Sequence, residues 1–194
     1  MADRLKFNKW VSKNNSHPKQ KIALREWIIK NIDNFDVLDV YGGYGLMYKK
    51  IWSIKAESYH TTKGDSINWL NNKRELKQNV YDVDPYASPF EALEIIGHKA
   101  TPKQIGIVCT DGSLRRCAFM RSSISKYLQK KCEWPRKSLP LMSAIYNQYP
   151  SFLRYVISCV MPKWSIQKLV VQEALGGHRM QQTMYFAILL NKKN

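Results

Sequence analysis

Acidic residues and cysteines are few in this sequence of 194 residues, and no apolar run is long enough to cross a membrane. The four cysteines show no paired short spacing, which argues against a zinc site and against a disulfide framework. The most apolar run, residues 152–161, is too short for a bilayer and contains Arg154. The first ten residues lack the apolar segment of a signal peptide. We therefore expect a cytoplasmic protein with reduced thiols, without a bound metal and without a membrane segment.

The shortage of acidic residues leaves the chain strongly basic. Lys and Arg number 31 and Asp and Glu number 15, which gives a formal net charge of +16. Such a surplus in a small chain favours a polyanionic partner, although an anionic membrane surface would also attract it. Aromatic residues make up 12% of the chain and are interleaved with basic ones, a pattern typical of nucleic-acid binding. Nucleic acid is therefore the partner that we expect.

The length and the hydrophobic content of 44% suit one compact domain over residues 1–194. An apolar strand is expected at residues 36–41, followed by three glycines within residues 42–45 and by a helix over residues 46–54. Glycines let the backbone approach a ligand, and the N-terminus of the following helix faces it. Asp39 lies inside the strand, just before the turn. This layout predicts a nucleotide-binding βα unit.

A second short strand, residues 79–83, ends on Asp84, Pro85 and Tyr86. This arrangement directs a carboxylate, a backbone carbonyl and an aromatic ring to one spot. The two oxygens can accept hydrogen bonds from a flat amine, such as the exocyclic amino group of a nucleobase, and the ring can stack on the base. Two simpler interpretations stay open, in which Asp84 caps the following helix and Tyr86 belongs to the core.

The remaining pattern predicts further strands and helices that complete an α/β fold. Helices are expected over residues 17–29, 66–76 and 88–96, and strands over residues 57–62, 105–109, 167–173 and 183–190, the last two as an antiparallel pair. The segment over residues 55–78 is shorter than two further strand–helix units need, so part of the fold is expected to be reduced there.

Residues 113–164 form a basic segment that we expect to be helical, an elaboration suited to contact with nucleic acid. It follows a strand end, and strand ends carry the ligand sites of such folds. A solvated basic surface is the simpler alternative. The residues that we propose for this contact are Arg115, Arg116, Arg121, Lys130 and Lys131.

Three stretches together resemble class I methyltransferases that use S-adenosylmethionine (SAM). Residues 37–45 resemble their donor-binding loop. Residues 84–86 resemble the Asp-Pro-Pro-Tyr motif of amino-methyltransferases, and residues 17–29 resemble the helix with His-Pro-x-Gln-Lys-Pro that precedes the donor loop in many DNA amino-methyltransferases. The longer stretch over residues 81–89 is similar to the Asp-Pro-Phe/Tyr-Gly-Ser-Pro signature of tRNA guanine-N2 methyltransferases, with Ala87 in place of glycine.

The resemblance implies a Rossmann-like fold, with a mostly parallel sheet of seven strands, an antiparallel last strand and helices on both faces. It implies SAM as the methyl donor and no catalytic metal. The implied catalytic residues are Asp84, Pro85 and Tyr86. The implied donor-binding residues are Asp39, Tyr41, Gly42, Gly43, Gly45, Asp65 and His17.

The target that this resemblance favours is the N2 amino group of guanine in tRNA. The alternative within the same chemistry is adenine N6 or cytosine N4 of DNA, which residues 17–29 favour. A binding module without catalysis is a second class, because the shortened segment over residues 55–78 could leave the chain unable to hold SAM. A partner subunit that supplies target recognition is compatible with all of these.

Overall fold

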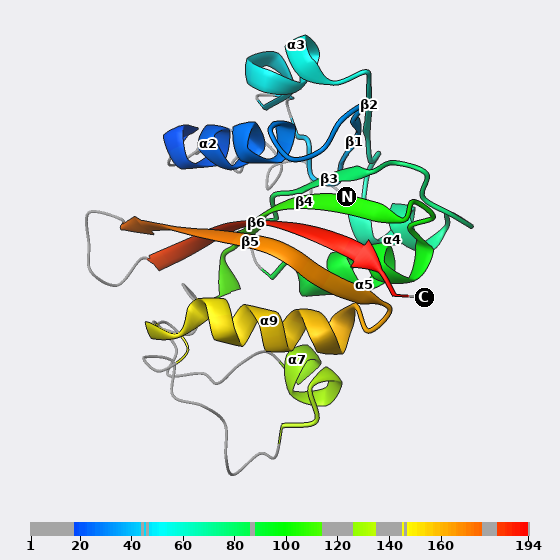
Figure 1. Ribbon diagram of the computed structural model, residues 1–194. Helices are drawn as coiled ribbons and strands as arrows, with labels where there is room; N and C mark the ends of the chain where they lie inside the picture. The colour runs from blue at the N-terminus through cyan, green and yellow to red at the C-terminus, as the bar shows by residue number, and fades with distance from the viewer. Residues whose placement is uncertain are drawn as a thin grey trace, which may run out of the picture.

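The structure is a computed structural model that describes residues 18–43, 45, 47–85, 88–113, 126–134, 145, 147–175 and 182–193. These residues form a six-stranded sheet in the order β2-β1-β3-β4-β6-β5 (Figure 1). The strands are β1 (Asp36–Asp39), β2 (Ser58–Thr61), β3 (Val80–Val83), β4 (Gln104–Asp111), β5 (Trp164–Leu175) and β6 (Gln182–Lys192). β1 to β4 are mutually parallel, and β6 runs antiparallel to both of its neighbours, β4 and β5. The expected Rossmann-like α/β fold is confirmed.

Helices cover both faces of the sheet, as Figure 1 shows. They are α2 (Pro18–Ile29), the π-helix η1 (Tyr48–Trp52), α3 (Ser53–Lys55), α4 (Ser66–Asn71), α5 (Phe90–Lys99), α7 (Lys126–Lys131) and α9 (Tyr149–Val160). On one face, Leu24 and Ile28 of α2 share a buried cluster with Val37 of β1 and Val80 of β3. α5 and α9 bury their apolar sides on the other face. Because both faces are covered, β3 is buried at all four residues.

One strand fewer is present than the resemblance implied. The described residues form six strands, and the segment between β2 and β3 holds only α4 and an isolated parallel bridge between Leu76 and Ala100. The expectation of seven strands is therefore wrong for this part of the chain. The physical reason is length, since the residues available there fall short of the roughly 30 that a βαβ unit needs. The reduction expected over residues 55–78 is the loss of this strand.

Two helices differ from their expected form. The helix expected over residues 46–54 begins as the π-helix η1 and continues as α3, and it buries Trp52 completely. The helix expected to reach residue 76 ends at Asn71. The side chain of Asp65 caps that helix by accepting a hydrogen bond from the backbone N–H of Asn68 at 3.1 Å.

The basic segment over residues 113–164 is not wholly an elaboration. α9 lies within it, and its Leu153, Val156, Ile157 and Val160 are buried in the main core. α9 is therefore an integral layer of the fold, and α7, which lies on the side of α9 away from the sheet in Figure 1, adds Leu128 to the same buried cluster. No helix of the described ranges is long and apolar enough to span a membrane.

Candidate active site

The candidate site lies where the carboxyl ends of β1 and β3 stand side by side. The chain continues from β1 to β2 on one side, and β3 pairs with β1 on the other, so the connections leave in opposite directions at this point. Such a switch point leaves a crevice at the carboxyl edge of a parallel sheet, where α/β proteins bind their ligands. The glycine turn follows β1 here, and Asp84 and Pro85 follow β3.

The glycine turn after β1 comes close to side chains below it. A Cβ at Gly42 would stand 2.7 Å from Thr61 Oγ1 and 3.0 Å from Asp39 Oδ2, so no larger residue fits without a shift. Gly43 and Gly45 have φ values of +49° and +68°, a region that L side chains rarely adopt. The turn therefore requires glycine for two separate reasons and presents backbone without side chains at the carboxyl edge of the sheet.

Asp39 lies beneath this turn and is only 3% exposed. Tyr59 of β2 donates a hydrogen bond to Asp39 Oδ2 at 2.8 Å. Burial is the main reason that the pKa of Asp39 rises to about 8. The charge of Asp82, its neighbour in the β1–β3 register, raises this pKa further, and the bond from Tyr59 lowers it only in part. Asp39 thus lies buried beneath the turn, bonded to β2.

Asp82 joins three elements inside the core. Arg25 of α2 donates two hydrogen bonds to its carboxylate, from Nε at 2.7 Å and from Nη2 at 2.5 Å. Trp52 of η1 donates a third from Nε1 at 2.8 Å. Asp82 and Arg25 are 1% and 2% exposed. Arg25 could not be identified from the sequence, because a cation on an apolar helix stripe gives no local sign of its partner.

Asp84 lies directly after β3 and forms an ion pair with Lys21 of α2, with 2.5 Å between Nζ and Oδ2. Burial opposes the ionisation of Asp84, but the charges of Lys21 and Arg25 and hydrogen bonds from Lys21 and Thr110 outweigh it. The pKa of Asp84 therefore lies below its ordinary value. The Asp84 side chain keeps 22% of its surface exposed, so its carboxylate remains accessible at the edge of the sheet.

The residues after Asp84 complete what the structure shows of this loop. Pro85 is buried, while Tyr86 lies outside the described residues. Ser88 Oγ is a buried atom for which the described part of the chain offers no hydrogen-bond partner. The described part of this loop thus offers Asp84 and the Pro85 carbonyl.

Tyr41 and Asp65 are two of the expected donor residues, and both lie further along the carboxyl edge of the sheet, toward α4. Tyr41 follows β1 and is half-buried. Burial raises its pKa to about 12, with further increases from Cys109, Glu91 and Asp65. Tyr41 thus lies within electrostatic range of the N-cap of α4 and of the first turn of α5. His17, the last of the expected donor residues, lies outside the described residues.

Asp111 at the end of β4 serves the fold. It is fully buried and accepts hydrogen bonds from the Ser113 backbone N–H at 2.9 Å and from Tyr149 Oη at 2.8 Å. Tyr149 belongs to α9. This carboxylate therefore ties α9 to the strand end and leaves Asp84 as the more accessible acid.

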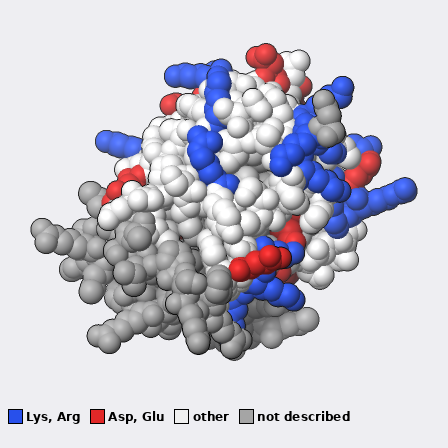
Figure 2. All heavy atoms as spheres, turned by 60° about the horizontal axis from the view of Figure 1, so that its bottom comes forward, with Lys and Arg blue, Asp and Glu red and all other residues white. Residues whose placement is uncertain are grey.

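The expected nucleic-acid contacts are described only in part. Arg115, Arg116 and Arg121 lie outside the described residues. Lys130 is exposed, and Lys131 forms an ion pair with Glu94 of α5. Figure 2 shows one face of the molecule, on which the described Lys and Arg side chains lie in separate groups divided by uncharged surface. The basic surface is thus spread over this face.

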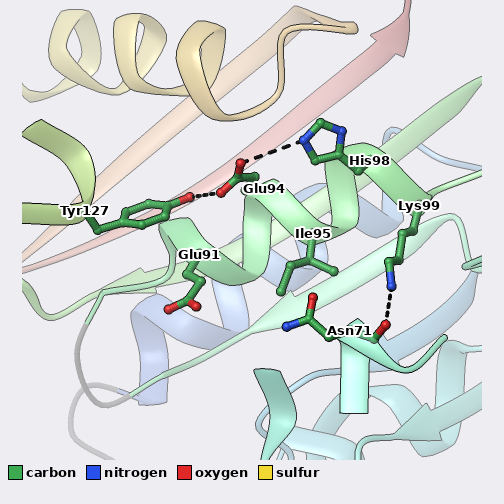
Figure 3. A pocket seen from close by; sticks show the side chains of 7 residues that line it. All are labelled: Asn71, Glu91, Glu94, Ile95, His98, Lys99 and Tyr127. Atoms are coloured by element: carbon green, nitrogen blue, oxygen red, sulfur yellow. Dashed lines mark hydrogen bonds and ion pairs between the residues drawn. The ribbon is translucent and has the colours of Figure 1, made fainter. Parts of the chain in front are cut away.

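A pocket of about 300 Å³ lies away from the strand ends, between α4, α5 and α7 (Figure 3). Glu94, which lines this pocket, accepts a hydrogen bond from Tyr127 Oη at 2.5 Å and forms an ion pair with Lys131. Lys99 Nζ donates to the carbonyls of Leu70 and Asn71 at 3.0 and 2.6 Å. These contacts join the three helices, so the polar residues that line the pocket have a structural role.

Lys99→Met is expected to lower the free energy of unfolding by about 0.5–1 kcal/mol, because a cation at the last carbonyls of α4 is lost. A urea unfolding curve measures this change. Lys103→Met removes an exposed cation and is the matched control, expected to change the midpoint little. Equal midpoints for the two variants would contradict the capping role.

No protein-family model matches this sequence, and no curated protein matches it. Protein 1320 of Thermoplasma acidophilum is similar in structure, with a TM-score of 0.51 and 9% identity over 89% of this chain and 84% of that one. The N-methyltransferase NodS of Bradyrhizobium japonicum has a TM-score of 0.49 and 9% identity, over 93% and 98% of the two chains. TYW2 of M. jannaschii, in complex with AdoMet, has a TM-score of 0.47 and 6% identity over 93% and 80%. At identities this low, such likenesses concern the fold alone.

Proposed function

We propose that this protein transfers a methyl group from SAM to an exocyclic amino group of a nucleobase in nucleic acid. The observation that carries the proposal is the placement of Asp84 and Pro85 at the end of β3, directly beside the glycine turn that follows β1. An ionised carboxylate with accessible surface and a ligand-binding turn thus share one edge of the sheet. Residues 37–45 and 84–86 carry the resemblance to SAM-dependent amino-methyltransferases, and the strands from which they continue, β1 and β3, are neighbours in the sheet.

The residues present fit the proposed donor. A Cβ at Gly42 would meet Thr61 and Asp39, and Gly43 and Gly45 adopt left-handed conformations, so the turn presents backbone where a ligand must approach closely. Asp39 lies beneath the turn, and its carboxyl would place negative charge under a cationic ligand once it gives up its proton. Tyr41 and Asp65 lie further along the edge, toward α4. When bound, SAM would supply an electrophilic methyl group.

The residues of the second loop would prepare the amine. The lone pair of an exocyclic amine is delocalised into the base, which makes the nitrogen a poor nucleophile. If Asp84 and the carbonyl of Pro85 accept its two N–H bonds, the nitrogen is drawn toward tetrahedral geometry and its lone pair becomes available. Asp84 is suited to this because Lys21 keeps it ionised. Tyr86 is proposed to stack on the base, which in a duplex must first leave the helix. Positioning and electrostatics would supply most of the rate.

Guanine N2 in tRNA is the target that we propose first, on the resemblance of residues 81–89. One observation favours the alternative, a DNA adenine-N6 or cytosine-N4 methyltransferase. Lys21 belongs to the segment that resembles the DNA amino-methyltransferase helix, and in the structure it contacts Asp84. The net charge of +16 supports a nucleic-acid partner of either kind, with Lys130 and the three arginines of residues 115–121 as proposed contacts. A partner subunit could supply target recognition.

The test is methyl transfer from radiolabelled SAM to total tRNA and, in parallel, to unmethylated duplex DNA. Heat-inactivated protein is the blank, and the products are digested to name the modified nucleoside. Calorimetry measures SAM binding in the same preparation. Label in N2-methylguanosine would establish the first target, and label in N6-methyladenine or N4-methylcytosine would establish the alternative. No label together with no SAM binding would overturn the proposal and leave a basic binding module.

The affinity for SAM is expected to increase as the pH rises from 6 to 7.5. The pKa of Asp39 is about 8, so this group holds a proton throughout that range, and a cationic donor would displace it. Up to one proton would be released, with Kd falling by up to about tenfold per pH unit. The groups that act on Asp39 are Asp82, Asp84, Arg25 and Tyr59. Calorimetry in buffers of different ionisation enthalpy measures the released proton.

Asp39→Asn supplies the control, because the amide cannot titrate. This variant is expected to bind SAM with an affinity that changes little over the same pH range. The raised pKa of Asp39 also affects the stability of the protein without SAM, because it stabilises the native state in which Asp39 is protonated. The contribution of Asp39 to stability is full near pH 4 and is lost as the pH rises through 8. Equal proton release by the wild type and Asp39→Asn would contradict this assignment.

A further inference from the structure

Two cations on α2 face two acids on and after β3. Lys21 and Arg25 are four residues apart on the helix, which corresponds to an axial rise of about 6 Å. Asp82 and Asp84 are two residues apart, about 6.6 Å along an extended chain. The two spacings agree, so Arg25 bonds Asp82 while Lys21 bonds Asp84.

The buried Arg25–Asp82 pair holds the part of α2 that carries Lys21 in place. Arg25 and Asp82 are almost completely buried, and their two hydrogen bonds determine how α2 lies on the sheet. Arg25 also donates from Nη1 to the backbone carbonyl of Lys21 at 2.8 Å, which ties the first turn of α2 to the same anchor. The Lys21 side chain is 9% exposed, and its Nζ lies 5.9 Å from the centroid of the Tyr185 ring on β6. Lys21 therefore has little freedom to point elsewhere.

We propose that Lys21 is a positioning residue for Asp84, aimed by the Arg25–Asp82 pair, and that it holds the acceptor carboxylate ionised and oriented for the amine. The proposal rests on the function proposed above and adds a residue on another element to its site. Among the described residues Asp84 bonds Lys21 and Thr110, and since a carboxylate has about four lone-pair sites, these two bonds leave acceptor positions for the amine. The amine can thus bond to Asp84 without displacing Lys21.

The environment of Asp84 makes Lys21 the decisive neighbour. Among the described residues, the charged or titratable groups that act on Asp84 or are acted on by it are Lys21 and Arg25 of α2, Asp39 of β1 and Cys109 of β4. Arg25 is already engaged by Asp82, and the other groups are acids or a buried thiol. Without Lys21, burial and the neighbouring acids would favour protonation of Asp84, and a protonated carboxyl accepts fewer hydrogen bonds.

The test is an NMR titration of protein labelled with ¹³C at the aspartate carboxyls, with Asp84→Ala used to assign the Asp84 signal. In Lys21→Met the pKa of Asp84 is expected to rise by one unit or more. Lys21→Arg is expected to keep the pKa near its wild-type value. Lys19→Met removes an exposed cation of the same helix and is the matched control, expected to leave the Asp84 signal unchanged. If Lys21→Met folds poorly, Lys21→Gln serves in its place.

Methyl transfer supplies a second reading. Lys21→Met is expected to move the acidic limb of the pH profile of kcat/KM upward by the same shift, with Kd for SAM within about twofold of wild type. A helix that merely lost stability would not move this limb. An unchanged Asp84 pKa in both Lys21→Met and Lys21→Gln would overturn the proposal. If the wild type methylates no substrate, the proposed function fails, and the titration still decides whether Lys21 controls Asp84.

Discussion

Replacing Arg25 by methionine is expected to lower the free energy of unfolding by about 3–5 kcal/mol. Asp82 is 1% exposed, so its charge would stay buried without its counterion. Among the described residues, Trp52 would be the one side chain still donating a hydrogen bond to it. Breaking a buried pair costs this much because the remaining charge is left without compensation. Urea unfolding at pH 7 measures the change, since urea adds no ionic screening.

Two further variants separate charge from packing. Arg154→Met removes an exposed cation of α9 and is expected to stay within about 0.5 kcal/mol of wild type. The double variant Arg25→Met with Asp82→Leu replaces the pair by apolar groups and is expected to recover much of the loss. A loss below about 1 kcal/mol in Arg25→Met alone would show that this pair does not anchor α2.

Asp84→Ala is expected to reduce the rate of methyl transfer by about 10²–10³-fold. This is the range found when one positioned hydrogen-bonding group that contacts the reacting atoms is deleted. The change deletes the acceptor that would draw the amine nitrogen toward tetrahedral geometry. It also leaves Lys21 without its ion-pair partner, so SAM binding and the urea midpoint are measured beside the rate. We expect SAM binding to persist, because the glycine turn and Asp39 are unchanged.

Asp33→Ala removes an exposed carboxylate before β1 and is the matched control, expected to keep full activity. The double variant Lys21→Met with Asp84→Ala removes the stranded cation as well. If this double variant regained activity, the loss in Asp84→Ala would come from the unpaired Lys21, and Asp84 would not be the acceptor. Full activity in Asp84→Ala itself would place the chemistry elsewhere.

Local chemistry made several parts of the site predictable. The strand expected over residues 36–41 could be identified from its apolar run. The turn after it could be identified from its glycines, because a positive φ favours glycine, as at Gly43 and Gly45. The strand before Asp84 could be identified because four buried residues end on an acid and a proline. The role of Asp84 in catalysis stays a prediction.

Other features had no sign in a local pattern. The π-helix after the glycine turn spans only five residues, too few for its apolar pattern to be told from that of an α-helix, so its form was not predicted. The cap that Asp65 supplies to α4 is a local contact with Asn68, three residues on, whereas the early end of α4 was not expected. The missing strand was visible only as a shortage of residues before β3.

The sequence by itself determined the strand and turn order, the Rossmann-like fold and the two loops, because each depends on residues that are neighbours in the chain. Only the tertiary structure decided which charges meet. Lys21 and Asp84 are 63 residues apart, and Arg25 and Asp82 are 57 apart. Their pairing follows from the packing of α2 across the sheet, where helical and extended spacings agree. Burial at that interface leaves each cation with an acid as its partner and sets the charge of the candidate site.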